Sequence, residues 1–141
     1  MTESERLRFD RLVEDAIESL PPRVRALLDE VPLVVLDQPE PAMLRDLELK
    51  PGDEAALDEI CGLHTGTALT ERSVEHHGDL PTVIHIFRRG IVSLAGGWER
   101  GAGQAGSADE DVYEEIRTTI LHEIGHHFGL DEDDLADLGY D

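Results

Sequence analysis

The stretch Leu121-His122-Glu123-Ile124-Gly125-His126-His127-Phe128-Gly129 decides the fold, because it places an H-E-x-x-H spacing inside a helical pattern. On a helix, His122 and His126 lie on one face, one turn above the other. Their imidazole nitrogens can then bind a single Zn²⁺ at about 2.0–2.1 Å. Glu123 follows His122, so its carboxylate can act on a metal-bound water without binding the metal itself. The stretch therefore predicts a zinc site with His122 and His126 as ligands and Glu123 as general base.

The residues before this stretch extend the helix. Apolar residues recur every four positions, at Val112, Ile116, Ile120, Ile124 and Phe128, which is typical of an amphipathic helix. Ile124 lies about 200° around the helix from each histidine. We therefore expect the apolar stripe to face the core and the histidine pair to face a cleft. Acidic residues at 109–111 suit the start of the helix, and Gly129 suits a left-handed C-terminal cap.

The third metal ligand is expected after Gly129, where the chain can turn back toward the histidines. In the pattern H-E-x-x-H-x-x-G-x-x-H/D the last position supplies that ligand, and here it is Glu132, between Asp131 and Asp133. Two histidines and one carboxylate leave a fourth position open for water. Glu132 is the first choice. Asp131, Asp133 or an upstream residue remain alternatives, as does a site without a third protein ligand.

The segment HEIGHHFGLDEDDL at 122–135 resembles the signature of the small bacterial zincin-like metallopeptidases, a family once described as a domain of unknown function. The resemblance extends upstream to the apolar patterns of residues 9–21, 63–73 and 80–89, and so covers about Arg8 to Tyr140. It implies zinc on His122 and His126, Glu123 as general base and an acidic third ligand. This chain departs from the family at Glu132, where Asp is expected.

The other elements predict an α+β fold: N-terminal helices, a small mixed sheet and the metal-binding helix near the C-terminus, as in a minimal zincin-like domain spanning residues 1–141. The expected helices are residues 5–20, 23–30 and 90–98, with residues 39–46 irregular or a short helix. The expected strands are residues 33–36, fully buried, and residues 60–64 and 82–88. Loops are expected at residues 47–58, 70–79 and 96–106. Residues 82–88 precede the metal helix, so we expect them to be the edge strand that holds an extended peptide.

Composition restricts the partners and the compartment. The net charge is −20, and residues 109–141 hold 12 acidic residues against the single Arg117. Such a surface disfavours nucleic acids and anionic membranes. Cys61 is the only cysteine, so no disulfide framework exists, which fits a reducing cytoplasm. The N-terminal residues lack the pattern of a signal peptide, and no apolar run approaches a membrane span. Cys61 is expected to be a small buried residue.

Two functions follow from these observations. The first is a cytoplasmic Zn²⁺-dependent metallopeptidase that cleaves a peptide or protein substrate. The second is a zinc-binding module of the same fold that regulates or binds other proteins without turnover. Among the remaining histidines, His85 is expected in the core, His127 in a packing or supporting role, and His64, His76 and His77 at the surface.

Overall fold

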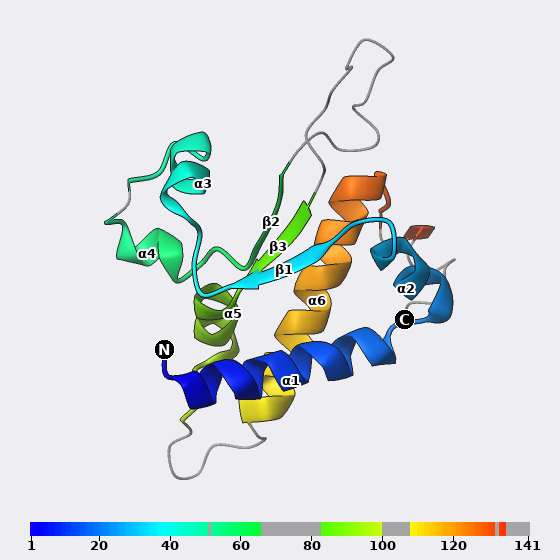
Figure 1. The fold of residues 1–141 in the computed structure, drawn as a ribbon, viewed down its shortest axis with the longest axis horizontal. Helices are drawn as coiled ribbons and strands as arrows, with labels where there is room; N and C mark the ends of the chain where they lie inside the picture. The colour runs from blue at the N-terminus through cyan, green and yellow to red at the C-terminus, as the bar shows by residue number, and fades with distance from the viewer. Residues whose placement is uncertain (51, 66–82, 100–107, 132, 135–141) are drawn as a thin grey trace.

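The computed structural model describes residues 1–50, 52–65, 83–99, 108–131 and 133–134, and leaves the side chains of residues 64 and 65 undescribed. The elements, in chain order, are α1 (Glu3–Ser19), α2 (Pro22–Leu28), β1 (Leu33–Leu36), α3 (Pro41–Asp46), α4 (Glu54–Leu57), β2 (Gly62–Thr65), β3 (Val83–Phe87), α5 (Arg88–Ala95) and α6 (Ala108–Phe128) (Figure 1). Helices and a small mixed sheet confirm the predicted α+β class. The predicted loop at 70–79, most of the glycine-rich stretch, and His76 and His77 lie outside the described residues.

The N-terminal helices begin and end where local chemistry requires. Thr2 caps α1 through a capping box: its hydroxyl accepts from the Glu5 amide at 3.1 Å, and the Glu5 carboxylate accepts from the Thr2 amide at 3.0 Å. The helix stops before Pro21, and Pro22 opens α2, where its missing N–H costs nothing. Both helices agree with the prediction to within two residues.

The sheet has the order β1-β3-β2. β1 runs parallel to β3, with Val34 opposite His85, and β2 runs antiparallel to it, with Leu63 opposite His85. The expectation that residues 82–88 form an edge strand is therefore wrong, because β3 is central and both its edges are paired. The strand at 33–36 exists, but as an edge strand with Val34 36% exposed rather than fully buried. A run of apolar residues alone cannot distinguish these two strand positions.

Two segments between β1 and α6 differ from the elements that the sequence predicts. The segment at 47–58, expected to be a loop, contains α4, which begins where the Asp53 carboxylate accepts from the Ala56 amide at 3.1 Å. The predicted helix at 90–98 is α5, which starts two residues earlier, directly after β3. Gly90 on α5 allows a close approach, since a Cβ there would lie 1.9 Å from the carbonyl oxygen of Ile60. The segment before β2 is thereby packed against α5.

The core forms around α6. Its residues Val112, Ile116, Ile120 and Ile124 are fully buried, as their spacing predicts. They pack with buried residues of α1, β3 and α5, among them Phe9, Ile84 and Ile91. Burial of each large aliphatic side chain contributes about 1.5–3 kcal/mol to stability. In Figure 1, α1 crosses α6, and β2 and β3 lie along its other side. No helix in the described ranges is long and apolar enough to span a membrane.

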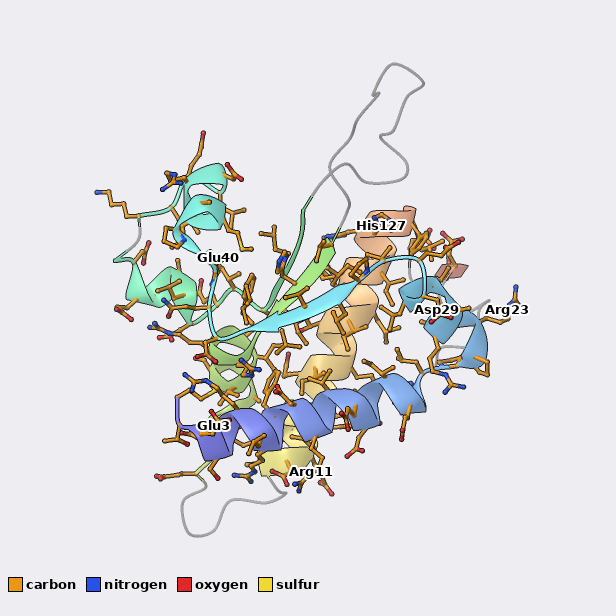
Figure 2. All side chains as sticks on the ribbon, in the orientation of Figure 1. Glu3, Arg11, Arg23, Asp29, Glu40 and His127 are labelled. Carbon is orange, nitrogen blue, oxygen red and sulfur yellow. The ribbon has the colours of Figure 1, made fainter. Side chains whose placement is uncertain are left out.

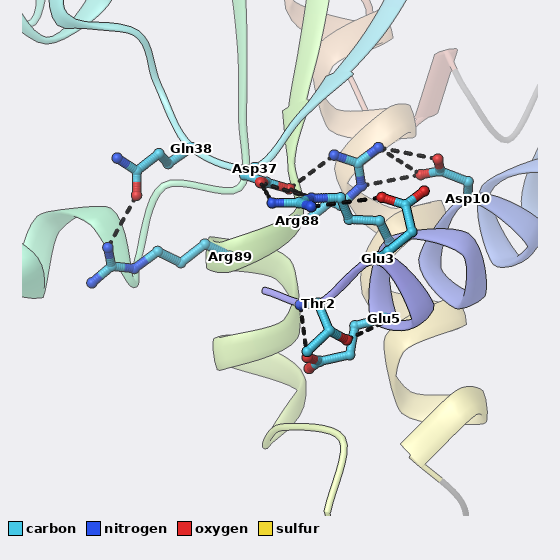
Figure 3. A network of polar contacts seen from close by, with 9 residues as sticks. Thr2, Glu3, Glu5, Asp10, Asp37, Gln38, Arg88 and Arg89 are labelled. Carbon is cyan, nitrogen blue, oxygen red and sulfur yellow. Dashed lines mark hydrogen bonds and ion pairs between the residues drawn. The ribbon is translucent and has the colours of Figure 1, made fainter.

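An ion-pair network joins α1, the end of β1 and the start of α5 (Figure 3). Arg88, whose side chain is 12% exposed, donates to Asp10 and Asp37 at 2.9 Å each. Arg6 also donates to Asp37, at 2.7 Å. These hydrogen bonds lower the pKa of the Asp37 carboxylate, Arg6 more than Arg88. The network holds α1 against one end of the sheet. The last turns of α6 lie near the other end (Figure 1).

Candidate metal centre

The last two turns of α6 bring together the three residues predicted for the metal site. One ligand atom from each of His122, Glu123 and His126 can be chosen so that all three lie within 4.8 Å of one another. The two imidazole rings have centroids 4.1 Å apart, as expected for residues four apart on one helix face. Both histidines are exposed, whereas Glu123 is only 6% exposed. The site thus combines two accessible nitrogen donors with a sheltered carboxylate.

Glu123 is sheltered by the first residue of β2. A Cβ on Gly62 would lie 3.0 Å from Glu123 Cγ, 3.2 Å from Glu123 Oε1 and 2.9 Å from Thr119 Cγ2. The absence of a side chain at Gly62 therefore lets the strand backbone approach the carboxylate closely. The sequence analysis did not identify Gly62. A glycine at the start of a strand was the available signal, but nothing in the sequence says which helix the strand approaches.

A cleft of about 460 Å³ opens beside the three residues. Its walls come from α6, from β2 and the segment before it, and from Leu47 after α3. The lining residues are Leu47, Glu59, Ile60, Cys61, Gly62, Leu63, Thr118, Thr119, His122, Glu123 and His126. The cleft is thus continuous with the histidine pair, as predicted for the face of α6 opposite Ile124. It is large enough to accept a substrate side chain next to the metal donors.

Cys61 forms part of the cleft wall. Burial raises the pKa of its thiol to about 11, and the negative charge of Glu115 adds to this effect. The thiol is therefore protonated at neutral pH and is a poor nucleophile there. Cys61 was expected to be a small buried residue, and the structure places it half-buried.

The helix ends as predicted at Gly129, which has a φ of 67°. The amide of Leu130 donates to the carbonyl of Gly125 at 2.8 Å, the long hydrogen bond of a Schellman cap. Asp131 and Asp134 then exchange hydrogen bonds between side chain and backbone, at 2.8 and 3.0 Å. Asp131 and Asp133 are exposed and do not belong to the group formed by His122, Glu123 and His126. Glu132 lies outside the described residues, so its role as third ligand stays a prediction.

Two other histidines lie in the interior. His127 is 4% exposed near the C-terminal end of α6, where Figure 2 labels it, and its ring lies 4.5 Å from that of Phe128. His85 is 9% exposed on the central strand, and burial lowers its pKa, so it is neutral at pH 7. Both positions agree with the expected core and packing roles. The side chain of His64 lies outside the described residues.

The donor set fits zinc. Two imidazole nitrogens on adjacent turns and a nearby carboxylate are ligand types that Zn²⁺ accepts. The exposure of the histidines leaves room for a further protein ligand and a water. The buried carboxylate is held beside this position by Gly62 and Thr119. The residues present therefore suit a zinc site of the kind that leaves a coordination position open.

Comparison with known proteins agrees with the fold and the donor set. The model of the zincin-like metallopeptidase family matches residues 28–140, which is 113 of the 141 residues. The match begins at the last residue of α2 and includes every element from β1 to α6. A comparison with curated proteins finds no match to this sequence. The chain therefore belongs to the zincin-like metallopeptidase family.

Proposed function

We propose that this protein is a zinc-dependent peptidase. The observation that carries the proposal is the buried Glu123 carboxylate, held under Gly62 beside the exposed pair His122 and His126 in an open cleft. A site that only stored zinc would have no need of a sheltered acid next to an open cleft. Glu132 is the proposed third ligand, because its distance from Gly129 matches the family spacing.

In the proposed mechanism, His122 and His126 bind zinc through their imidazole nitrogens. When bound, zinc supplies Lewis-acid polarisation of the scissile carbonyl and makes water acidic enough to ionise near neutral pH. A Glu123 carboxylate oxygen takes the proton from the attacking water and later passes it to the leaving amine nitrogen. Burial of Glu123 against Gly62 and Thr119 keeps this carboxylate oriented through both transfers.

The substrate backbone is proposed to bind along β2. Phe87 donates its amide to the Cys61 carbonyl at 2.8 Å, and hydrogen-bonded pairs alternate along an antiparallel ladder. In this register the amides and carbonyls of Gly62 and His64 point away from β3. Within the described residues β2 has no strand on that side. An extended peptide can therefore add to β2, which takes the role that the sequence had suggested for residues 82–88.

The proposed substrate is a peptide or protein rather than a nucleic acid or a membrane, since the chain carries a net charge of −20. The proposed compartment is the cytoplasm, because the single Cys61 offers no disulfide that an oxidising environment would stabilise. The alternative function, a zinc-binding module without turnover, is distinguished by the experiment below.

The test combines metal analysis with a peptide-library digest. Purified protein is expected to bind about one zinc per chain and to cleave peptides of the library. A chelator should abolish this cleavage, and added zinc should restore it. Glu123→Gln should keep zinc and lose at least ~100-fold in hydrolysis, because it cannot take the proton. Glu114→Gln, an equal change at an exposed position of the same helix outside the cleft, is the control. Zinc binding without hydrolysis in the unaltered protein would support the non-catalytic module instead.

A further inference from the structure

The cleft beside the metal centre has an apolar wall. Leu47, Ile60 and Leu63, none of which belongs to α6, line it. Leu47 is 38% exposed and is not part of the core cluster, so its apolar surface is available to a bound molecule. Leu63 belongs to β2, the strand proposed to pair with the substrate backbone. A side chain of a peptide lying along β2 would therefore reach this wall.

The same wall is surrounded by negative charge. Exposed Glu59 lines the cleft, and Glu115 lies close enough to Cys61 to raise the pKa of its thiol. Among the described residues, no Lys or Arg lines the cleft. The wall segment at residues 45–59 carries six carboxylates, of which Glu54 and Asp58 pair with Arg89. Its own cations, Arg45 and Lys50, do not line the cleft.

The arginines of the neighbouring elements are neutralised elsewhere. Arg89 is ion-paired with Asp58 and Glu54, and Arg88 with Asp10 and Asp37, and none of these residues lines the cleft. A bound zinc would add two positive charges, which the proposed carboxylate ligand and Glu123 would together balance. Glu59, which lines the cleft, therefore keeps its attraction for a cation.

We infer that the cleft selects peptide segments in which an apolar side chain is flanked by basic residues, with Leu47, Ile60 and Leu63 receiving the apolar group and Glu59 pairing with a basic one. This inference rests on the proposed function for its site, and it adds the substrate class. One unit-charge pair about 4 Å apart in water changes an equilibrium by roughly fivefold. Because Glu59 attracts the basic peptide and repels the acidic one, each by about that factor, the two peptides should differ in affinity by about 10- to 30-fold at low salt, and by much less at high salt.

The test measures binding apart from hydrolysis. Three fluorescent peptides of equal length carry a central Leu flanked by Arg, Gln or Glu, and are titrated into zinc-loaded Glu123→Gln protein by anisotropy at low and high salt. The Arg peptide should bind tightest and the Glu peptide weakest. Glu59→Gln should weaken the Arg peptide about threefold to fivefold. Glu14→Gln, the same charge change at an exposed position of α1 outside the cleft, should not.

The apolar half of the inference has its own pair of variants. Leu47→Ser should weaken all three peptides by about threefold or more, whereas Leu94→Ser, at an exposed leucine of α5 outside the cleft, should leave them unchanged. Equal binding of the three peptides, binding of none, or an equal effect of Glu59→Gln and Glu14→Gln overturns the inference. Hydrolysis without the charge preference leaves the proposed function standing and refutes the inference. The charge preference without hydrolysis supports the inference and refutes the proposed function.

Discussion

Gly62→Ala tests whether the close approach of β2 to Glu123 matters for catalysis. The added methyl would lie 3.0 Å from Glu123 Cγ and 2.9 Å from Thr119 Cγ2. To reach ordinary contact near 3.4 Å, Glu123 must move by about 0.4 Å and Thr119 by about 0.5 Å. Both side chains are at most 7% exposed, so neither can move into solvent. The strand, the helix or the carboxylate must shift instead.

The expected magnitudes follow from these displacements. Overpacking of this size costs about 1 kcal/mol of unfolding free energy, at the low end for a single added methyl. A displacement of about 1 Å at a reacting group costs roughly 100-fold in rate, so about 0.4 Å should cost roughly 10-fold in kcat/KM. Zinc affinity should change by less than about threefold, because the exposed His122 and His126 are not the residues nearest to the added methyl.

The assay compares zinc affinity, thermal stability and peptide hydrolysis in Gly62→Ala and in Gly52→Ala. Gly52 is the matched control, since a Cβ there meets no atom within 4 Å and the residue does not line the cleft. Alanine keeps the Gly62 amide, so pairing with a substrate backbone is preserved and the loss should appear mainly in kcat. Unchanged hydrolysis in Gly62→Ala, with a melting temperature equal to that of Gly52→Ala, would refute the argument.

Three further predictions concern the metal ligands, the core and the ion-pair network. Glu132→Ala should weaken zinc binding markedly and Glu132→Asp should retain it, while Asp131→Ala and Asp133→Ala weaken it less. Isothermal titration measures all four, with His122→Ala as the variant that loses the metal, and a larger loss in Asp131→Ala than in Glu132→Ala would reassign the ligand. Ile120→Ala, in the fully buried stripe of α6, should cost about 2–5 kcal/mol in denaturant unfolding, and a loss below 1 kcal/mol would contradict the core. Asp37→Asn should cost roughly 1 kcal/mol at pH 7, after discounting for a side chain 36% exposed. Because Arg6 and Arg88 lower the pKa of Asp37, its contribution is present above the ordinary value of 3.8 and is lost as the pH falls below it. The difference in stability between Asp37→Asn and the unaltered protein should therefore shrink at acid pH, and a difference independent of pH would exclude this linkage.

The sequence by itself determined the features that depend only on residues close together along the chain. The i,i+4 spacing of His122 and His126 fixes their shared face once α6 forms, and the four-residue apolar period from Val112 to Ile124 fixes which face is buried. The cap at Gly129 follows in the same way from local backbone preference. These predictions were confirmed because each needs only a helix.

Only the tertiary structure decided how distant segments meet. Val83–Phe87, within the predicted strand at 82–88, form the central strand because β1 and β2, from two separate segments, pair with its two edges. The periodicity of one strand does not indicate which strands it pairs with. The same non-local pairing sets Gly62 against Glu123 and Leu47 at the cleft wall. The metal helix could be predicted from nine consecutive residues, whereas the cleft beside it also depends on Leu47 and residues 59–63, about 60 to 75 residues before His122 in the sequence.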